Sequence, residues 1–228
     1  MIESIHPVFT WSQDRIFAGG NHDVVLLVEW KGNTPSEHSQ PSSHKVVARD
    51  IELRVWLEPH VTFKRCYGCE MEVGEGNSLL LKLGKIKTGQ RKFIGLEFTT
   101  SSSVAGKYEA LSLQWKYKKP TVERVRELPV QVLELEYAHH TRILSDTCCF
   151  HVEKHLELLK TAETVEKAAG LRNKGEYSEA REMLNRHADK LLLLAVRSGD
   201  PLLIKEAEML YKQIGFEYPQ RSKTVGGI

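Results

Sequence analysis

The residues best suited to chemistry are cysteines and histidines, and they fall into two groups. The first is the pair Cys66 and Cys69, whose C-x-x-C spacing is used by redox pairs and by half of many zinc sites. The second group comprises Cys148, Cys149, His151 and His155. His151 and His155 are four residues apart on a predicted helix, so their rings share one face, which is a common ligand spacing. These six residues are the candidate metal ligands of the chain.

A zinc site would need the two groups to meet, because a C-x-x-C supplies only two ligands. A thioredoxin-type redox motif would need to open a helix after a buried parallel strand. Cys66 and Cys69 lie instead among predicted antiparallel strands, and nothing in the sequence brings the two groups together. We therefore expect small buried cysteines, exposed histidines and no cofactor. Zinc binding or thiol redox chemistry through these residues is the alternative.

Other catalytic motifs are missing from the sequence. In the stretch 151–155 the glutamate, Glu153, stands at the wrong offset for the zincin pattern His-Glu-x-x-His. The chain contains no Gly-x-Ser-x-Gly elbow, no phosphate loop and no Gly-x-Gly-x-x-Gly. We expect a protein that is not an enzyme.

Composition narrows the class of partner. Lys and Arg total 32 against 30 Asp and Glu. Charges this close to balance give no reason to expect nucleic acid or an anionic membrane as a partner. The hydrophobic share of 41% suits a globular protein, and no apolar run approaches the ~20 residues of a membrane span. The first residues do not resemble a secretory signal, so we expect a cytoplasmic protein with reduced cysteines.

The first two-thirds of the chain alternate between apolar and polar residues. Rows of this kind occupy 51–57, 94–98 and 111–117, and glycine-rich turns separate them. Such rows are typical of antiparallel strands with one wet face, and several of them at this spacing predict a β-sandwich. The opening rows in 9–30 need partners to bury Val24, Leu26 and Val28. We expect these rows to pair with strands that follow Lys45.

The period changes to that of a helix near Asp146. The first predicted apolar stripe is Val152, Leu156, Leu159, Ala162, Val165 and Ala169. The second is Tyr177, Ala180, Leu184, Ala188, Leu191 and Ala195, and the third is Ile204, Ala207, Leu210 and Ile214. Gly175 is placed to end the first helix, while Asp200 and Pro201 suit the N-cap and first residue of the third.

This order of elements resembles bacterial proteins in which a von Willebrand factor type A (VWA) domain is inserted in a β-sandwich that a helical tail follows. The turn at Gly19 and Gly20, the strand closed by Lys119 and Pro120, and the hairpin at 173–181 carry the resemblance. The hairpin also resembles one tetratricopeptide unit.

The metal-binding part of that family has no counterpart in this sequence. A VWA domain binds a divalent cation through an Asp-x-Ser-x-Ser signature, and no such string occurs here. Only the polar stretch 32–45 stands where the inserted domain would be, and it is too short for an α/β domain. The resemblance therefore implies the sandwich and its tail, with the VWA domain itself absent.

We predict an α+β, mainly β fold with three parts. Residues 1–145 form an antiparallel sandwich with the polar loop 32–45, residues 146–218 form a three-helix tail packed on it, and 219–228 form a flexible C-terminus. The predicted function is a non-enzymatic interaction or scaffold protein. Its partner would be another protein, with a homo-oligomer possible, and neither nucleic acid nor membrane is expected.

Overall fold

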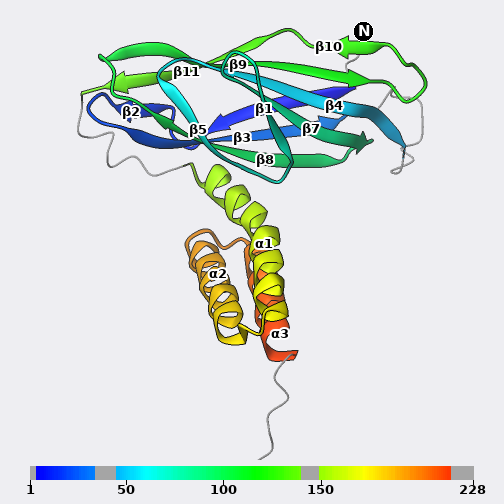
Figure 1. Ribbon diagram of the computed structural model, residues 1–228, viewed down its shortest axis with the longest axis vertical. Helices are drawn as coiled ribbons and strands as arrows, with labels where there is room; N and C mark the ends of the chain where they lie inside the picture. The colour runs from blue at the N-terminus through cyan, green and yellow to red at the C-terminus, as the bar shows by residue number, and fades with distance from the viewer. Residues whose placement is uncertain (1–3, 34–44, 140–148, 217–228) are drawn as a thin grey trace, which may run out of the picture. The chain divides into compact units, whose positions relative to one another are not determined.

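The computed structural model describes residues 4–33, 45–139 and 149–216, which form strands and helices in the order shown in Figure 1. The chain divides into two compact units, Met1–Leu156 and Glu157–Ile228. The first contains two β-sheets and the start of helix α1, and the second contains the rest of three helices. The mainly β, α+β class predicted from the sequence is confirmed. The packing of the helices on the sandwich stays a prediction, and 219–228 lie outside the described residues.

The first sheet has four antiparallel strands in the order β1-β3-β8-β5. Their bounds are β1 (Ile5–Trp11), β3 (His22–Gly32), β8 (Arg91–Thr100) and β5 (Val61–Tyr67). Strand β3 pairs with β8 along ten residues, from His22 opposite Thr100 to Lys31 opposite Arg91. The prediction that the opening rows pair with strands beyond Lys45 is therefore confirmed.

The second sheet has the order β2-β11-β9-β4-β7-β6, with β10 also paired to β9. Its strands are β2 (Arg15–Phe17), β4 (Val46–Leu57), β6 (Met71–Gly74), β7 (Ser78–Lys87), β9 (Gly106–Lys118), β10 (Val125–Glu127) and β11 (Gln131–Ala138). All pairs are antiparallel except β11 with β2. The predicted antiparallel sandwich therefore has one parallel pair at this edge, because the short β2 joins a strand far along the sequence instead of a hairpin neighbour.

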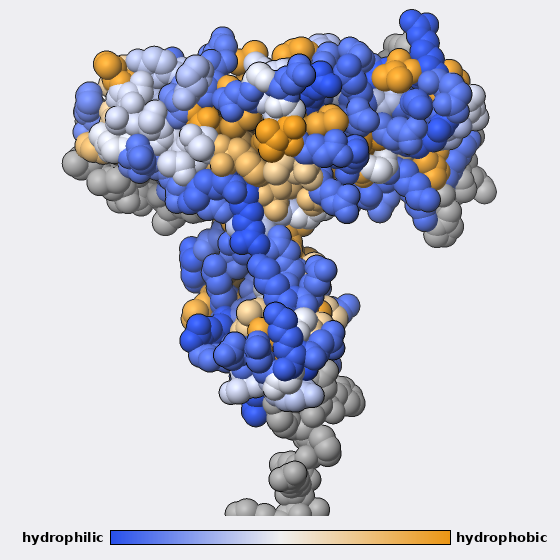
Figure 2. Space-filling model, in the orientation of Figure 1, coloured by the Kyte–Doolittle hydropathy of each residue, from blue (hydrophilic) through white to orange (hydrophobic). Residues whose placement is uncertain are grey.

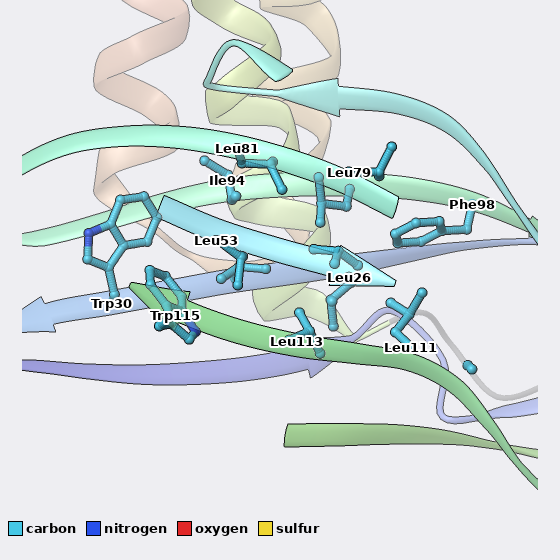
Figure 3. Packing of buried hydrophobic residues seen from close by; sticks show 14 of the residues in the cluster. Leu26, Trp30, Leu53, Leu79, Leu81, Ile94, Phe98, Leu111, Leu113 and Trp115 are labelled. Atoms are coloured by element: carbon cyan, nitrogen blue, oxygen red, sulfur yellow. The ribbon is translucent and has the colours of Figure 1, made fainter. Parts of the chain in front are cut away.

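The core lies between the two sheets and is built from the predicted alternating rows (Figure 3). Leu53, Leu81 and Leu113 from the second sheet are fully buried, as are Leu26 and Phe98 from the first. Two indole rings fill one end of this core.

Those rings belong to Trp30 and Trp115, one from each sheet, and their centroids are 5.7 Å apart. Each ring is at most 2% exposed. Burial of such large apolar side chains is the main favourable term in holding two sheets together.

The polar stretch 32–45 leaves and re-enters the sandwich at one place, although 34–44 lie outside the described residues. The N–H of Gly89 donates to the carbonyl of Gly32 at 2.8 Å, and the N–H of Thr88 donates to the carbonyl of Lys45 at 2.9 Å. Both ends of the stretch are thus fixed to the turn between β7 and β8. A Cβ at Gly32 would lie 2.2 Å from the carbonyl oxygen of Lys87, so this approach requires glycine.

The three helices are α1 (Phe150–Asn173), α2 (Tyr177–Ser198) and α3 (Pro201–Phe216). Gly175, with φ +84°, follows the end of α1 as predicted, and its N–H donates to the carbonyl of Arg172. The Asp200 side chain accepts a hydrogen bond from the N–H of Leu202 at 2.9 Å, and α3 begins at Pro201. The sequence signals for these two boundaries are confirmed.

The helix faces follow the predicted stripes only in part. Five of the six predicted residues of α2 are buried, namely Ala180, Leu184, Ala188, Leu191 and Ala195. Tyr177 is 58% exposed, and in α3 Leu203 takes the buried position expected for Ile204. In α1 Val152 is buried as predicted, but the stripe was wrong at Ala162 and Ala169, which are exposed. Glu157 and Ala168, which the stripe left out, are buried.

Packing of α2 leads to a first prediction. Ala180 and Leu184 are both fully buried. Ala180→Leu should overpack its contact and lower the free energy of unfolding by ~1–3 kcal/mol, whereas Leu184→Ala should leave a cavity and lower it by ~2–5 kcal/mol. Urea unfolding followed by circular dichroism measures both effects. Tyr177→Ala is the matched control, since its ring is largely exposed, and near-wild-type stability in both test variants would contradict this packing.

Candidate functional site

The thiols of Cys66 and Cys69 lie side by side where the chain passes from β5 to β6. Their sulfur atoms are 3.4 Å apart, and the Cys66 Sγ also lies 3.7 Å from the carbonyl oxygen of Cys69. Gly68, between them, has φ +91°, which lets the short turn reverse. Both thiols are half-buried and pack against the sandwich core. Hydrogen bonding with Cys66 and burial together raise the pKa of the Cys69 thiol, so this group holds its proton.

The two histidines lie together at the start of α1. His155 stacks on Phe93 with ring centroids 3.9 Å apart, and the His151 ring is 4.6 Å from that of His155. The His151 Nε2 is 3.7 Å from the Oε2 of Glu29, and the other oxygen of that carboxylate, Oε1, accepts a hydrogen bond from Arg91 at 3.1 Å. The expectation of exposed histidines is confirmed for His151, whereas His155 is half-buried, and both rings contact Phe93 on the sheet.

The register of β8 separates the two groups. Cys66 lies opposite Leu96, whose side chain is buried in the core, so Cys66 belongs to the inner face of the first sheet. Phe93 precedes Leu96 by three residues, and residues an odd number apart on a strand face opposite sides. The ring that stacks with His155 therefore belongs to the outer face. The structure brings Cys66 together with Cys69 and His151 together with His155, but it places these two pairs on opposite faces of the sheet.

The described members of the two groups do not come together as one zinc site. Within the part of the chain that the structure describes, no group of three or more His, Cys, Asp or Glu side chains is arranged to hold a metal ion. Cys149 precedes α1, and its N–H donates to the carbonyl of Ser12 at 2.9 Å. Cys148 lies outside the described residues.

A buried ionic cluster in the helical unit was missed by the sequence analysis. Glu157 on α1 is 3% exposed, and its Oε1 accepts hydrogen bonds from Lys160 and Lys190, both at 2.9 Å. The other oxygen, Oε2, lies 4.0 Å from the Nδ1 of His187 and has no hydrogen-bond partner among the described residues. The Nε2 of that ring is 2.9 Å from the hydroxyl of Thr161.

The cluster perturbs the two buried titratable groups in it. Burial alone would raise the pKa of Glu157, but the hydrogen bonds from Lys190 and Lys160 outweigh it and lower that pKa. Burial lowers the pKa of His187, although the Glu157 carboxylate opposes the change. Because the Glu157 carboxylate joins Lys160 on its own helix to Lys190 on α2, the cluster acts as an ionic tie between α1 and α2.

Several large apolar side chains are exposed on the helical unit, where scattered orange atoms interrupt the blue surface in Figure 2. Val196 is 84% exposed and Leu193 is 66% exposed, and both belong to α2. On α3, Leu202, Ile204 and Met209 are each 41% exposed. The predicted stripe placed Ile204 inside, so sequence periodicity did not reveal this surface. The sequence signal that could have revealed it is that two large apolar residues of α2, Leu193 and Val196, fall outside the predicted buried stripe.

Comparison with known proteins gives a likeness in structure alone. No protein-family model matches the chain, and no curated protein matches its sequence. A solved structure described as the ArnB paralog VWA2 from Sulfolobus acidocaldarius has a TM-score of 0.55 at 9% identity, covering 93% of this chain and 98% of that one. A von Willebrand factor type A structure from Catenulispora acidiphila has a TM-score of 0.53 at 15% identity and covers 75% of this chain.

The chain is similar in fold to proteins that include the VWA type. It spans 39% of the Catenulispora chain. Identities this low show the fold alone, so no site or ligand is carried over. Among the described helices, none combines the length and the apolar character that a membrane span requires.

Proposed function

We propose that the protein is a non-enzymatic interaction or scaffold protein that binds another protein through its helical unit. The observation that carries this proposal is the exposure of Leu193 and Val196 on α2. The two residues are three apart on one helix, so they project from the same side as neighbours. Large apolar side chains that cluster on a surface are typical of protein-binding sites.

The rest of α2 explains why a partner is needed to cover this pair. Its other side is already occupied by Leu184, Ala188 and Leu191, which are fully buried. A helix cannot turn both faces inward at once, so Leu193 and Val196 stay exposed within the described helical unit and are available to a second molecule. A partner helix or groove with a complementary apolar face would do so. A second copy of this chain is one such partner.

We further propose that the chain keeps a VWA-type sandwich and tail without a VWA domain, and that it works in the cytoplasm without a metal. The paired anchoring of Gly32 and Lys45 on one turn supports this proposal, because the sandwich needs no intervening domain to close. A cytoplasmic protein would keep its thiols reduced. The tetratricopeptide likeness of 173–181 stays a prediction.

The test is affinity capture with the full chain and two matched variants, followed by titration of a purified captured protein. Leu193→Ser/Val196→Ser removes the α2 pair. Val122→Ser/Val125→Ser is the control, because these valines are also about half exposed, at 46% and 47%, but lie on the sandwich. We expect the wild type and the control to bind a common partner, or to self-associate in sedimentation, and the α2 variant to lose that binding. Equal capture by all three chains would overturn the proposal.

A further inference from the structure

The turn between β5 and β6 occupies a special place in the sandwich. Strand β5 is an edge of the four-stranded sheet and β6 is an edge of the second sheet, so this turn carries the chain from one layer to the other. Cys66 lies in the last part of β5, and Cys69 stands two residues before β6. The cysteines therefore flank the point where the two layers are joined.

We infer that Cys66 and Cys69 form a reversible dithiol–disulfide couple that small disulfides oxidise and small thiols reduce. The sulfurs are already in van der Waals contact at 3.4 Å, and the thiols are half-buried, so a small reagent can reach them. The intervening Gly68 supplies the flexibility with which a short turn adjusts to a covalent link.

The chemistry balances with a low-molecular-weight disulfide such as oxidised glutathione. One cysteine thiolate attacks a sulfur of glutathione disulfide, which forms a mixed disulfide and releases one glutathione thiolate. The second cysteine then attacks the cysteine sulfur of this mixed disulfide. That attack closes the Cys66–Cys69 bond and releases the second glutathione as a thiolate. The protein loses two electrons and two protons, and the reagent becomes two thiols. Dithiothreitol reverses both steps.

Either thiol can make the first attack. The two sulfurs are 3.4 Å apart and either S–H can donate to the other, so once one cysteine ionises its neighbour can hold the remaining proton. Hydrogen bonding with Cys66 raises the pKa of the Cys69 thiol, and the two thiols titrate as a pair. Whichever sulfur forms the mixed disulfide, the other resolves it.

Oxidation should also stiffen the join between the sheets. Strand β6 is only four residues long, and Val73 within it is 78% exposed. Few buried side chains therefore hold this edge strand against β7. A bond from Cys69 to Cys66 ties the start of β6 to β5, which is paired with β8. The disulfide is thus a clamp on an otherwise loosely held edge strand.

The experiment uses the full chain carrying Cys148→Ser and Cys149→Ser, so that only the pair can react. After oxidised glutathione, we expect loss of both titratable thiols, loss of the mass of two hydrogen atoms, and a peptide map that places an internal disulfide at 66–69. Dithiothreitol should restore both thiols. Amide hydrogen exchange in β6 should slow in the oxidised chain. The unsubstituted chain is treated in parallel and should give the same bond.

Cys69→Ser in the same background is the matched variant. Without a resolving thiol, Cys66 should retain one glutathione adduct. Three results would overturn the couple. The first two concern the chain with Cys148→Ser and Cys149→Ser, which would keep both thiols or carry a separate glutathione adduct on each sulfur. The third is a bond to Cys148 or Cys149 in the unsubstituted chain. Unchanged exchange in β6 despite complete oxidation would overturn the clamp.

Discussion

Trp115→Ala should lower the free energy of unfolding of the sandwich by ~3–5 kcal/mol. The ring is fully buried, and it contacts both Trp30, at 5.7 Å between centroids, and Phe9, at 6.4 Å. These three residues come from both sheets, so the cavity would open across the layer boundary, where neither sheet can collapse without moving the other. The measurement is urea unfolding followed by tryptophan fluorescence and circular dichroism.

Trp56→Ala is the matched control for this substitution. Trp56 lies on the neighbouring strand β4 and is partly exposed, with the guanidinium of Arg54 5.8 Å from its ring. Its removal should cost less than about 1.5 kcal/mol, since little buried volume is lost. Equal destabilisation by the two substitutions would show that the core does not depend on the Trp30–Trp115 contact.

The β-rich part of the fold was predictable because its physical signal is local. In β9, residues Leu111, Leu113 and Trp115 face the core while Ser112 and Gln114 face outward, and this alternation can be seen in the sequence. Which strand pairs with which was harder to predict from the sequence. The parallel edge pair of β2 and β11 joins residues about 120 positions apart, as Arg15 and Glu136 show, and no periodicity encodes such a contact.

The candidate site was predictable as residue types but not as an arrangement. The C-x-x-C spacing keeps Cys66 and Cys69 close to each other, because the turn between them is short. Whether they also meet His151 and His155 depends on which face of the sheet each group occupies. That is fixed by the register of β5 and β8 and not by sequence spacing.

The buried face of α1 was mispredicted because apolar periodicity treats every carboxylate as solvent-exposed. Glu157 occupies the core side of the helix with its charge neutralised by Lys160 and Lys190. Lysine stems can reach inward while the ammonium groups remain partly in water. A buried charge that is paired in this way breaks the apolar pattern without breaking the helix.

Removal of both lysines should therefore have a large effect. Lys160→Met/Lys190→Met would leave the Glu157 carboxylate buried without a cation, and we expect the free energy of unfolding at pH 7 to fall by ~3–5 kcal/mol. Lys167→Met/Lys205→Met is the matched control. Lys167 pairs with Glu163 at the surface, where such a pair contributes little. Urea unfolding followed by the helical circular dichroism signal measures the difference.

Replacing the carboxylate as well should rescue the variant. Glu157→Gln added to Lys160→Met/Lys190→Met removes the unpaired charge and keeps a side chain of nearly the same volume. The triple variant should regain part of the lost stability. A triple variant that is less stable than the double one would show that the lysines act through packing and not through the charge of Glu157.

The pH dependence of stability gives the sharpest test. The contribution of Glu157 to it should have opposite signs in the wild type and in the lysine double variant. In the wild type the pKa of Glu157 is lowered, so its stabilisation is complete above the unfolded value of 4.5 and is lost as pH falls through the folded pKa. His187, whose pKa is also lowered, acts in the same direction below 6.5. Without the lysines, burial should raise the pKa of Glu157. Protonation of Glu157 would then remove the buried charge and raise the free energy of unfolding of the variant as pH falls. The stability gap between wild type and double variant should narrow steadily from neutral pH into acid, and a constant gap would mean that Glu157 does not carry the charge assigned to it.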